Sequence, residues 1–388
     1  MNRFTRTKKL QFTAACLGML LFGVVMISLG SLIPMVAEKF DLNEIEAGTV
    51  LSLLPFGILL GSMVFGPLVD LIGYKKILLA GALFSFFGFH GIGWSGSYGW
   101  LQISILLIGF GGGILNGATN ALVSDISTDR QSANLSILGV FFGVGALSVP
   151  ALVGLLKVYL SLEQITLWIG MSLLIPILFF LTVNFPKPKN AQGFPIAKGL
   201  ELLKDPVLLS LALVLFFQSA LEGLTNNWTT TFLQNEKSFS SENALFSLSL
   251  FVAGLTLTRL VLGKILQKYN PYKVLIYSLI CLLISILVFW QSTNSILSLI
   301  ALIAIGVGLA SGFPVVLGYV GRLYSDLSGT AFSLVITIAL IGNVTCNYLM
   351  GLISQFYGIS SFPMFLTLLL LLMSALILSI RKKQIFNT

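Results

Sequence analysis

Long apolar segments constrain this chain more than any other feature. Twelve runs of about 20 or more mostly apolar residues follow one another along its 388 residues, separated by short polar breaks. A helix of about 20 apolar residues crosses the hydrocarbon core of a bilayer and satisfies its own backbone hydrogen bonds there. We therefore expect an all-α membrane protein with twelve transmembrane helices, near 10–37, 46–69, 76–95, 99–123, 132–158, 163–183, 206–233, 243–267, 273–291, 295–321, 328–356 and 360–380.

The composition supports lipid as the surrounding medium. Only 9% of the residues are charged and the mean hydropathy is +0.97, whereas a soluble domain has about 25% charged residues. The basic residues form short clusters between apolar runs and no continuous basic face. We therefore expect the chain to be surrounded by a lipid bilayer and not to bind nucleic acid. Cys16, Cys281 and Cys346 have no metal-ligand spacing. We expect no disulfide, no metal and no cofactor, and we interpret the first apolar run as a span and not a cleaved signal peptide.

The distribution of Lys and Arg predicts the orientation. Eighteen of the 22 basic residues lie at the termini or in the even-numbered loops, whereas the opposite loops hold only Lys39, Lys157 and Lys237. Loops rich in Lys and Arg stay in the cytoplasm. We therefore expect a multi-pass protein of the plasma (inner) membrane with both termini in the cytoplasm. The remaining basic residue, Arg259, lies within a span.

The two halves of the chain repeat each other. A shift of 197 residues superimposes eight special positions, which are Gly57 on Gly254, Gly66 on Gly263, Lys76 on Lys273, Gly109 on Gly306, Gly111 on Gly308, Asp129 on Asp326, Gly145 on Gly342 and Gly154 on Gly351. The longest polar break, at 184–206, lies between the halves. We predict an N-terminal six-helix bundle (1–185), a cytoplasmic linker (186–204) and a C-terminal six-helix bundle (205–388). Such parallel six-helix repeats describe the major facilitator architecture.

The loop after the second span carries a family signature. The stretch "GPLVDLIGYKK" at 66–76 resembles the loop signature of the major facilitator superfamily at Gly66, Asp70, Gly73, Lys75 and Lys76, with Leu71 where a basic residue is usual. The second copy, at 263–273, has Gln267 where the Asp would stand. We expect a tight turn here, with Asp70 bound to a helix N-terminus or to a basic partner of the other half. The resemblance implies two pseudo-symmetric bundles, a substrate between them, alternating access and a functional monomer.

Three further segments resemble one branch of that family, the fucose:proton symporters and sodium-dependent glucose transporters. They are "GFGGGILNGATNALVSD" (109–125), "FFGVGALSVPALVG" (141–154) and "FFQSALEGLTNNWTTTFL" (216–233). Members of this branch often carry a His just before the Phe-Phe-Gly of the second segment, where this chain has Gly139 and Val140. The resemblance implies transport of a sugar.

Polar residues form stripes on three spans, because residues four apart share a helix face. The stripes are Gln218–Glu222–Asn226, Asn116–Asn120 and Asn343–Asn347. Amides both donate and accept hydrogen bonds, as sugar hydroxyls require. We predict that the first two stripes, with Asn227 and a Trp228 that stacks on the sugar ring, bind the substrate. The alternative is hydrogen bonding between helices, and we favour it for Asn343 and Asn347.

Several ionisable residues receive separate interpretations. Glu222 is the candidate for ion coupling, because a carboxyl in a membrane span is costly unless it is neutralised; a proton and a sodium ion both fit this role. Asp125, with Asp129 and Arg130, suggests a loop-capping or gating cluster. For Arg259 we expect a structural role, snorkelling or pairing with a carboxylate. His90 is interpreted as an interfacial residue.

The sequence offers no sign of an enzyme, since it has no nucleophile–base pair, no phosphate-binding loop and no metal-ligand cluster. The first hypothesis is ion-coupled uptake of a monosaccharide or a similar neutral polar solute. The alternative is proton-coupled efflux of drugs or amphiphilic metabolites, which predicts a greasier cavity. Organic-anion exchange would need basic residues inside the cavity spans and ranks last among the transport functions. A sensor built on a transporter scaffold would bind solute tightly without moving it.

Overall fold

The computed structural model describes residues 6–42, 44–127, 130–157, 159–187, 201–202 and 204–382. Within these ranges the regular elements are helices, and twelve spans are long and apolar enough to cross a membrane. All twelve predicted spans are confirmed, each within a few residues of its expected bounds. The predicted linker at 186–204 lies mostly outside the described residues, and its boundaries stay a prediction.

Seven helices make up the first six spans. They are α1 (Arg6–Phe40), α2 (Glu44–Ile72), α3 (Tyr74–Trp94), α4 (Tyr98–Ile126), α5 (Gln131–Leu156), α6 (Leu162–Ser172) and α7 (Leu174–Thr182). The sixth span is divided between α6 and α7 at Leu173. Pro176 explains the break, because proline has no N–H for the carbonyl four residues earlier and its ring clashes with that carbonyl.

The remaining six spans follow the same plan. They contain α9 (Pro206–Lys237), α10 (Ser241–Lys268), α11 (Pro271–Gln291), α12 (Ser295–Leu309), α13 (Gly312–Leu323), α14 (Ser328–Tyr357) and α15 (Phe362–Lys382), with short 3-10 turns at Ser325–Leu327 and Ile359–Ser361. The tenth span is divided between α12 and α13, where Pro314 removes a donor. Asp205 begins the second set by accepting hydrogen bonds from the amides of Val207 and Leu208 (2.7 and 3.2 Å), as an N-cap does.

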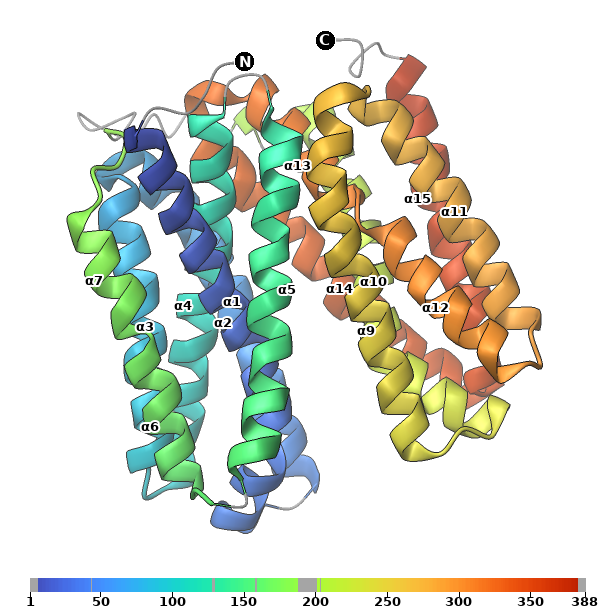
Figure 1. Ribbon diagram of the computed structural model, residues 1–388, viewed down its shortest axis with the longest axis horizontal. Helices are drawn as coiled ribbons and strands as arrows, with labels where there is room; N and C mark the ends of the chain where they lie inside the picture. Colours follow the sequence, from blue (N-terminus) through green and yellow to red (C-terminus); the bar gives the residue numbers. More distant parts are fainter. Residues whose placement is uncertain are drawn as a thin grey trace. The chain divides into compact units, whose positions relative to one another are not determined.

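The helices pack into two compact units (Figure 1). The first contains Met1–Thr128, Phe141–Gly199 and Tyr324–Leu334, and the second contains Asp129–Val140, Leu200–Leu323 and Val335–Thr388. Each unit therefore includes one short segment from the other half of the sequence. In the first unit this segment is the start of α14, and in the second it is the start of α5.

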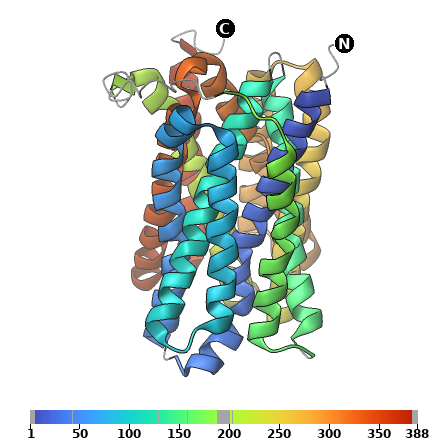
Figure 2. The same ribbon diagram turned by 90° about the vertical axis from the view of Figure 1, so that its left-hand side faces the viewer.

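Close glycine contacts hold the helices of each unit together. In the first unit, Gly109 of α4 meets Gly57 of α2 with so little room that a Cβ on Gly109 would lie 3.1 Å from the Cα of Gly57. In the second unit, the equivalent Gly306 of α12 lies against Gly254 of α10 in the same way. The repeat found in the sequence is therefore also a repeat of helix contacts. Figure 2 shows α3 beside α4, a pair that packs through Gly111 against the carbonyl of Gly81.

Candidate functional site

The polar stripe of α9 begins with Gln218 and Glu222. The Gln218 amide donates to Glu222 Oε1 at 3.0 Å and to the carbonyl of Leu309 at 2.9 Å. Leu309 is the last residue of α12, where the break in the tenth span exposes backbone carbonyls. Gln218 is buried, whereas Glu222 is half-buried. Asn226, the third member of the stripe, is exposed and donates to the Glu222 carbonyl at 3.1 Å.

Arg259 of α10 supplies the charge that balances Glu222. Its Nη2 lies 3.2 Å from Glu222 Oε1, and the side chains are 7% and 19% exposed respectively. A buried carboxylate without a partner would be strongly destabilising, so this pair explains how Glu222 is tolerated within an apolar span. Pairing with a carboxylate was one of the two roles expected for Arg259. The second carboxylate oxygen of Glu222 has no hydrogen-bond partner within the described part of the chain.

Asn227 and Trp228, both predicted to bind substrate, contact α14. The Asn227 amide and the Trp228 indole N–H donate to Asn347 Oδ1, at 3.0 and 3.1 Å. Asn343, one turn earlier on α14, donates to the carbonyl of Ser219 on α9 at 3.1 Å. The interpretation of Asn343 and Asn347 as a tie between helices is therefore confirmed. The Trp228 N–H and one of the two Asn227 amide hydrogens are thus used in this tie. Substrate binding by Asn227 and Trp228 stays a prediction.

The stripe of α4 bonds within its own helix. Asn120 donates to the carbonyl and the side-chain oxygen of Asn116, at 2.8 and 3.1 Å. Asn120 is buried and Asn116 is half-buried. The NH₂ of Asn116 has no recorded acceptor among the described residues, so it remains a donor that a solute hydroxyl could engage.

The signature loop after α2 has the expected turn. Gly73 has φ +87°, a left-handed conformation that favours glycine. Asp70 is buried and its Oδ2 accepts from the amide of Thr330 at 3.0 Å and from its hydroxyl at 2.8 Å. Thr330 lies in the first turn of α14, so Asp70 takes the first of its two expected roles, binding at a helix N-terminus. Gly66 lies against the backbone of Gly329, where a side chain would not fit.

Further polar residues of this loop region bond near the ends of the spans. Asp125 of α4 accepts from the Tyr74 hydroxyl at 2.6 Å and from the Ser328 hydroxyl at 2.7 Å. Lys75 donates to the carbonyl of Leu181 at 2.6 Å, and Lys76 is exposed. Of the other residues grouped with Asp125 in the predicted cluster, Asp129 lies outside the described residues.

Arg130 takes part in a contact that matches the one made by Asp70. Its Nη1 donates to Oε1 of Gln267 on α10 at 2.9 Å. Gln267 occupies the position equivalent to Asp70 at the offset of 197. In each unit, the residue at this position therefore bonds at the start of a long helix from the other half of the sequence: Asp70 at α14, and Gln267 next to α5.

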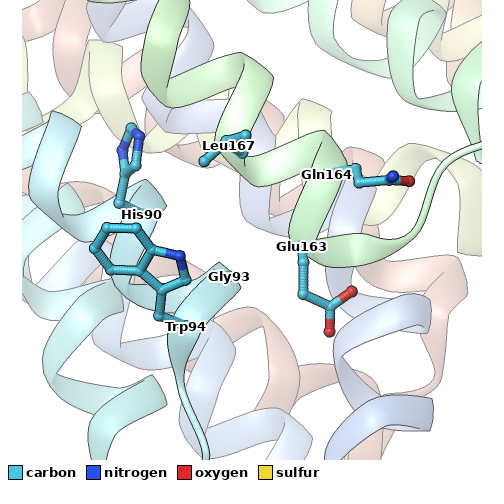
Figure 3. Close-up of a pocket in the computed structure, with 6 residues that line it drawn as sticks. All are labelled: His90, Gly93, Trp94, Glu163, Gln164 and Leu167. Carbon is cyan, nitrogen blue, oxygen red and sulfur yellow. The ribbon is translucent and has the colours of Figure 1, made fainter.

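A small cavity of about 150 Å³ lies between α3 and α6, away from the polar stripes. It is lined by His90, Gly93, Trp94, Glu163, Gln164 and Leu167 (Figure 3). His90 Nδ1 bonds to the Phe86 carbonyl at 2.9 Å, and Glu163 pairs with Lys39 at 2.7 Å. The Glu163 carboxylate and the Gln164 amide point away from the His90 ring. These polar groups do not converge on the cavity, so it does not resemble a substrate site.

Comparison with known proteins decides the family. A family model described as Major Facilitator Superfamily matches residues 15–272 and 245–385. The chain belongs to the major facilitator superfamily. It is thus an integral, multi-pass membrane transporter and not an enzyme. The resemblance noted in the loop at 66–76 is confirmed.

The names of individual relatives state different transported compounds. The glucose/mannose transporter GlcP of Bacillus subtilis (strain 168) is 23% identical over 346 residues, which cover 85% of this chain and 84% of GlcP. A homologue of the multi-drug resistance efflux pump PmrA, from Lactococcus lactis subsp. lactis (strain IL1403), is 25% identical over 254 residues, which cover 61% and 60% of the two chains.

Solved structures share the fold. The E. coli fucose:proton symporter FucP has a TM-score of 0.82 at 17% identity, with 96% of this chain and 98% of FucP covered. The proton:xylose symporter XylE has a TM-score of 0.78 at 14% identity, with 96% of both chains covered. Both are major facilitator transporters, and the likeness confirms the fold of two pseudo-symmetric six-helix bundles.

Sequence reasoning did not connect Glu222 with Arg259, or Asp125 with Tyr74 and Ser328. A signal for the first pair was present, because one acid and one base lie inside consecutive apolar spans. Opposite charges in neighbouring spans usually pair. No comparable signal existed for Tyr74 and Ser328, whose hydroxyls lie at helix ends where any polar residue is expected.

Proposed function

We propose that this transporter takes up a neutral, polyhydroxylated solute, a monosaccharide, together with a proton. The observation that carries the proposal is the Glu222–Arg259 pair within the polar stripe of α9. Because Arg259 balances the carboxylate, the polar surface around the pair is rich in donors and acceptors but has no net charge. A neutral solute with many hydroxyls suits such a surface better than an anion or a cation does.

The available hydrogen-bonding groups support a sugar. Among the described residues, the Asn116 NH₂ has no acceptor and one Glu222 carboxylate oxygen has no donor, and Asn226 is exposed. Sites built to bond hydroxyl groups discriminate strongly against solutes that lack them, because their buried polar groups are then left unpaired. The likeness to a glucose/mannose transporter points in the same direction.

A proton fits the coupling role better than a sodium ion. Arg259 lies 3.2 Å from the carboxylate that would have to bind the ion. A sodium ion at Glu222 would experience repulsion from this guanidinium at short range. The guanidinium opposes protonation as well, but a proton needs no space and no further ligands beside Arg259: it binds a carboxylate oxygen and leaves a neutral acid that still forms hydrogen bonds. We infer in addition that the protein acts as a monomer in the inner membrane with both termini in the cytoplasm.

Proton-coupled efflux of drugs or amphiphilic metabolites is the second candidate. The likeness to a multi-drug efflux pump homologue favours it, as do the 30 phenylalanines of the chain. Efflux substrates are amphiphilic cations, which need apolar contacts and an acid that is free to pair with them. The occupation of Glu222 by Arg259 argues against such an acid at this position.

Counterflow in proteoliposomes distinguishes the candidates. Purified protein is reconstituted and tested with labelled hexoses, pentoses and amphiphilic cations. If the protein takes up a sugar, we expect counterflow with at least one labelled sugar and none with the cations. Counterflow with cations alone would refute sugar uptake and support efflux as the function. Tight binding of a sugar without any flux would indicate a sensor.

The coupling role of Glu222 is tested by substitution. Glu222→Gln should abolish accumulation driven by a proton gradient and spare exchange of pre-loaded substrate, because the amide cannot take up a proton. The double variant Glu222→Gln with Arg259→Gln removes both charges and separates loss of coupling from loss of folding. A Glu222→Gln protein that still concentrates substrate against its gradient would show that coupling lies elsewhere.

The α4 stripe is tested by affinity. Asn116→Leu and Asn120→Leu should each weaken sugar binding about 10-fold, as expected for the loss of one or two hydrogen bonds. Thr119→Val is the matched control, since Thr119 is buried on the same helix and bonds to the carbonyls of Leu115 and Asn116. Unchanged affinity in both Asn variants would assign this stripe to helix packing.

A further inference from the structure

We propose that Arg259 is a positioning residue that links the ionisation of Glu222 to the contact between α10 and the first turns of α5. The inference rests on the proton-coupling role proposed above for Glu222. It adds a path by which the proton changes helix packing at a distance from the carboxylate. Three observations carry it. They are the stripe of α10 that meets α5, the contact of Arg259 with Gly139, and the bond of its guanidinium to Glu222, beside a buried Nε without a partner among the described residues.

One face of α10 meets the start of α5. The Ser136 hydroxyl donates to the Arg259 carbonyl at 2.6 Å. One turn further along α10, Gly263 faces Ile137, whose Cδ1 would lie 3.3 Å from an added Cβ. Another turn further, Gln267 accepts from Arg130. Positions 259, 263 and 267 are four apart, so they form one stripe, and Arg259 is its end nearest to α9.

The Arg259 side chain lies directly on Gly139 of α5. A Cβ at Gly139 would lie 2.9 Å from Arg259 Cδ and 3.3 Å from both Nε and Nη1. Contacts of that length force the arginine to move, so the absence of a side chain at 139 makes room for the guanidinium. Gly139 therefore holds Arg259 from one side while Glu222 holds it from the other.

The guanidinium depends on Glu222 for its position. Arg259 Nε is buried without a hydrogen-bond partner among the described residues, and the recorded side-chain bond goes to Glu222 Oε1. No other charged side chain is recorded in contact with Glu222 on the described parts of α10, α12, α13, α15 and the start of α5. Of the other arginines on these elements or beside them, Arg322 lies over the Tyr319 ring at 5.5 Å and Arg130 is bonded to Gln267.

The consequence follows from charge balance. When a proton binds the Glu222 carboxylate, the guanidinium keeps its charge and loses its ionic partner in a poorly hydrated place. Such an arrangement is strongly unfavourable, so Arg259 moves toward water or another acceptor. This movement takes the side chain off Gly139 and loosens the stripe at Gly263 and Ile137. Protonation of Glu222 thereby changes the packing where α5 meets α10.

The test measures the access of a reagent to this contact. Cys16, Cys281 and Cys346 are replaced by Ala, Ile137→Cys is introduced, and its reaction with N-ethylmaleimide is followed in membranes without substrate. We expect Glu222→Gln to raise the labelling rate at least about 5-fold at neutral pH, the lower end of typical coupling between sites. The ratio of this rate to that of the parent should fall toward one as the pH is lowered, because the parent carboxylate then becomes protonated. Taking a ratio at each pH removes the pH dependence of the thiol.

Two further variants separate a positioning role from a merely structural one. Gly139→Ala should raise labelling from the opposite side by displacing Arg259, whereas Gly154→Ala, on the same helix with nothing within 4 Å of the added Cβ, should match the parent. The ratio of the labelling rates with and without Glu222→Gln is also measured in two Arg259 backgrounds. With Arg259→Lys, which keeps a charge, the ratio should still depend on pH. With Arg259→Gln it should not.

Equal labelling of the parent and of Glu222→Gln at neutral pH, in protein that remains monodisperse, would overturn the link. This outcome can be distinguished from failure of the proposed function, because labelling is measured in the absence of substrate and does not depend on which solute is transported. Coupled sugar transport with unchanged labelling would refute the link alone. A labelling ratio that depends on pH, in a protein that transports no sugar, would refute the proposed substrate and leave the link intact.

Discussion

Removal of one charge from the Glu222–Arg259 pair gives the prediction with the largest expected effect. The two charges lie 3.2 Å apart, which corresponds to about 5 kcal/mol of attraction at an effective dielectric constant of about 20. The side chains are 19% and 7% exposed, so residual solvent screening places the expected loss at the lower end of the range for broken buried pairs. We expect Arg259→Gln to lower the free energy of unfolding by about 3 kcal/mol.

The double variant distinguishes a pair from two independent charges. Glu222→Gln alone leaves an unpaired buried cation and should cost a similar amount. Because Glu222→Gln with Arg259→Gln leaves no buried charge, we expect it to lose less than the sum of the singles, with an interaction energy of about 2 kcal/mol. The assay is a titration of purified protein with denaturing detergent in mixed micelles, followed by tryptophan fluorescence. Strict additivity of the two single losses would refute the ion pair as the feature that stabilises Glu222 in the span.

Three further substitutions test other contacts by the same titration. Asp70→Asn should cost about 1–2 kcal/mol, because it removes a carboxylate from the N-terminus of α14, and no loss would contradict that role. Trp228→Phe should cost about 0.6–1 kcal/mol through loss of its hydrogen bond to Asn347, and should cost less once Asn347→Ala is present. Gly113→Ala should cost about 2 kcal/mol, since its Cβ would overlap the backbone of α2, whereas Gly30→Ala, with open space around it, should not destabilise.

The sequence was informative wherever the bilayer acts on each segment separately. Each helix must be apolar and about 20 residues long whatever its neighbours are, so hydropathy alone placed all twelve spans. Two of them contain breaks, at Leu173 and after Leu309, that hydropathy did not reveal. The breaks reflect proline and local backbone geometry, to which an average over a long window is insensitive.

The partners of the polar residues were less predictable. The spacing of Gln218, Glu222 and Asn226 placed them on one face of α9, and the structure agrees. Asn227 and Trp228 were expected to bind the substrate as well; in the structure both donate to Asn347 of α14, a contact that the sequence did not predict, and their substrate binding stays a prediction. A side chain in a membrane span can bond to any neighbouring helix, and hydropathy carries no information about which helix that is.

Apolar length and the 197-residue repeat were thus determined by the sequence itself, because the hydrocarbon core imposes the same condition on every span and duplication leaves the glycine contacts in register. The tertiary structure alone decided that Arg259 balances Glu222, that Asp70 binds the start of α14, and that Gln267 receives Arg130. These choices join residues far apart along the chain. They depend on which helix faces come together, and packing of the whole unit determines that.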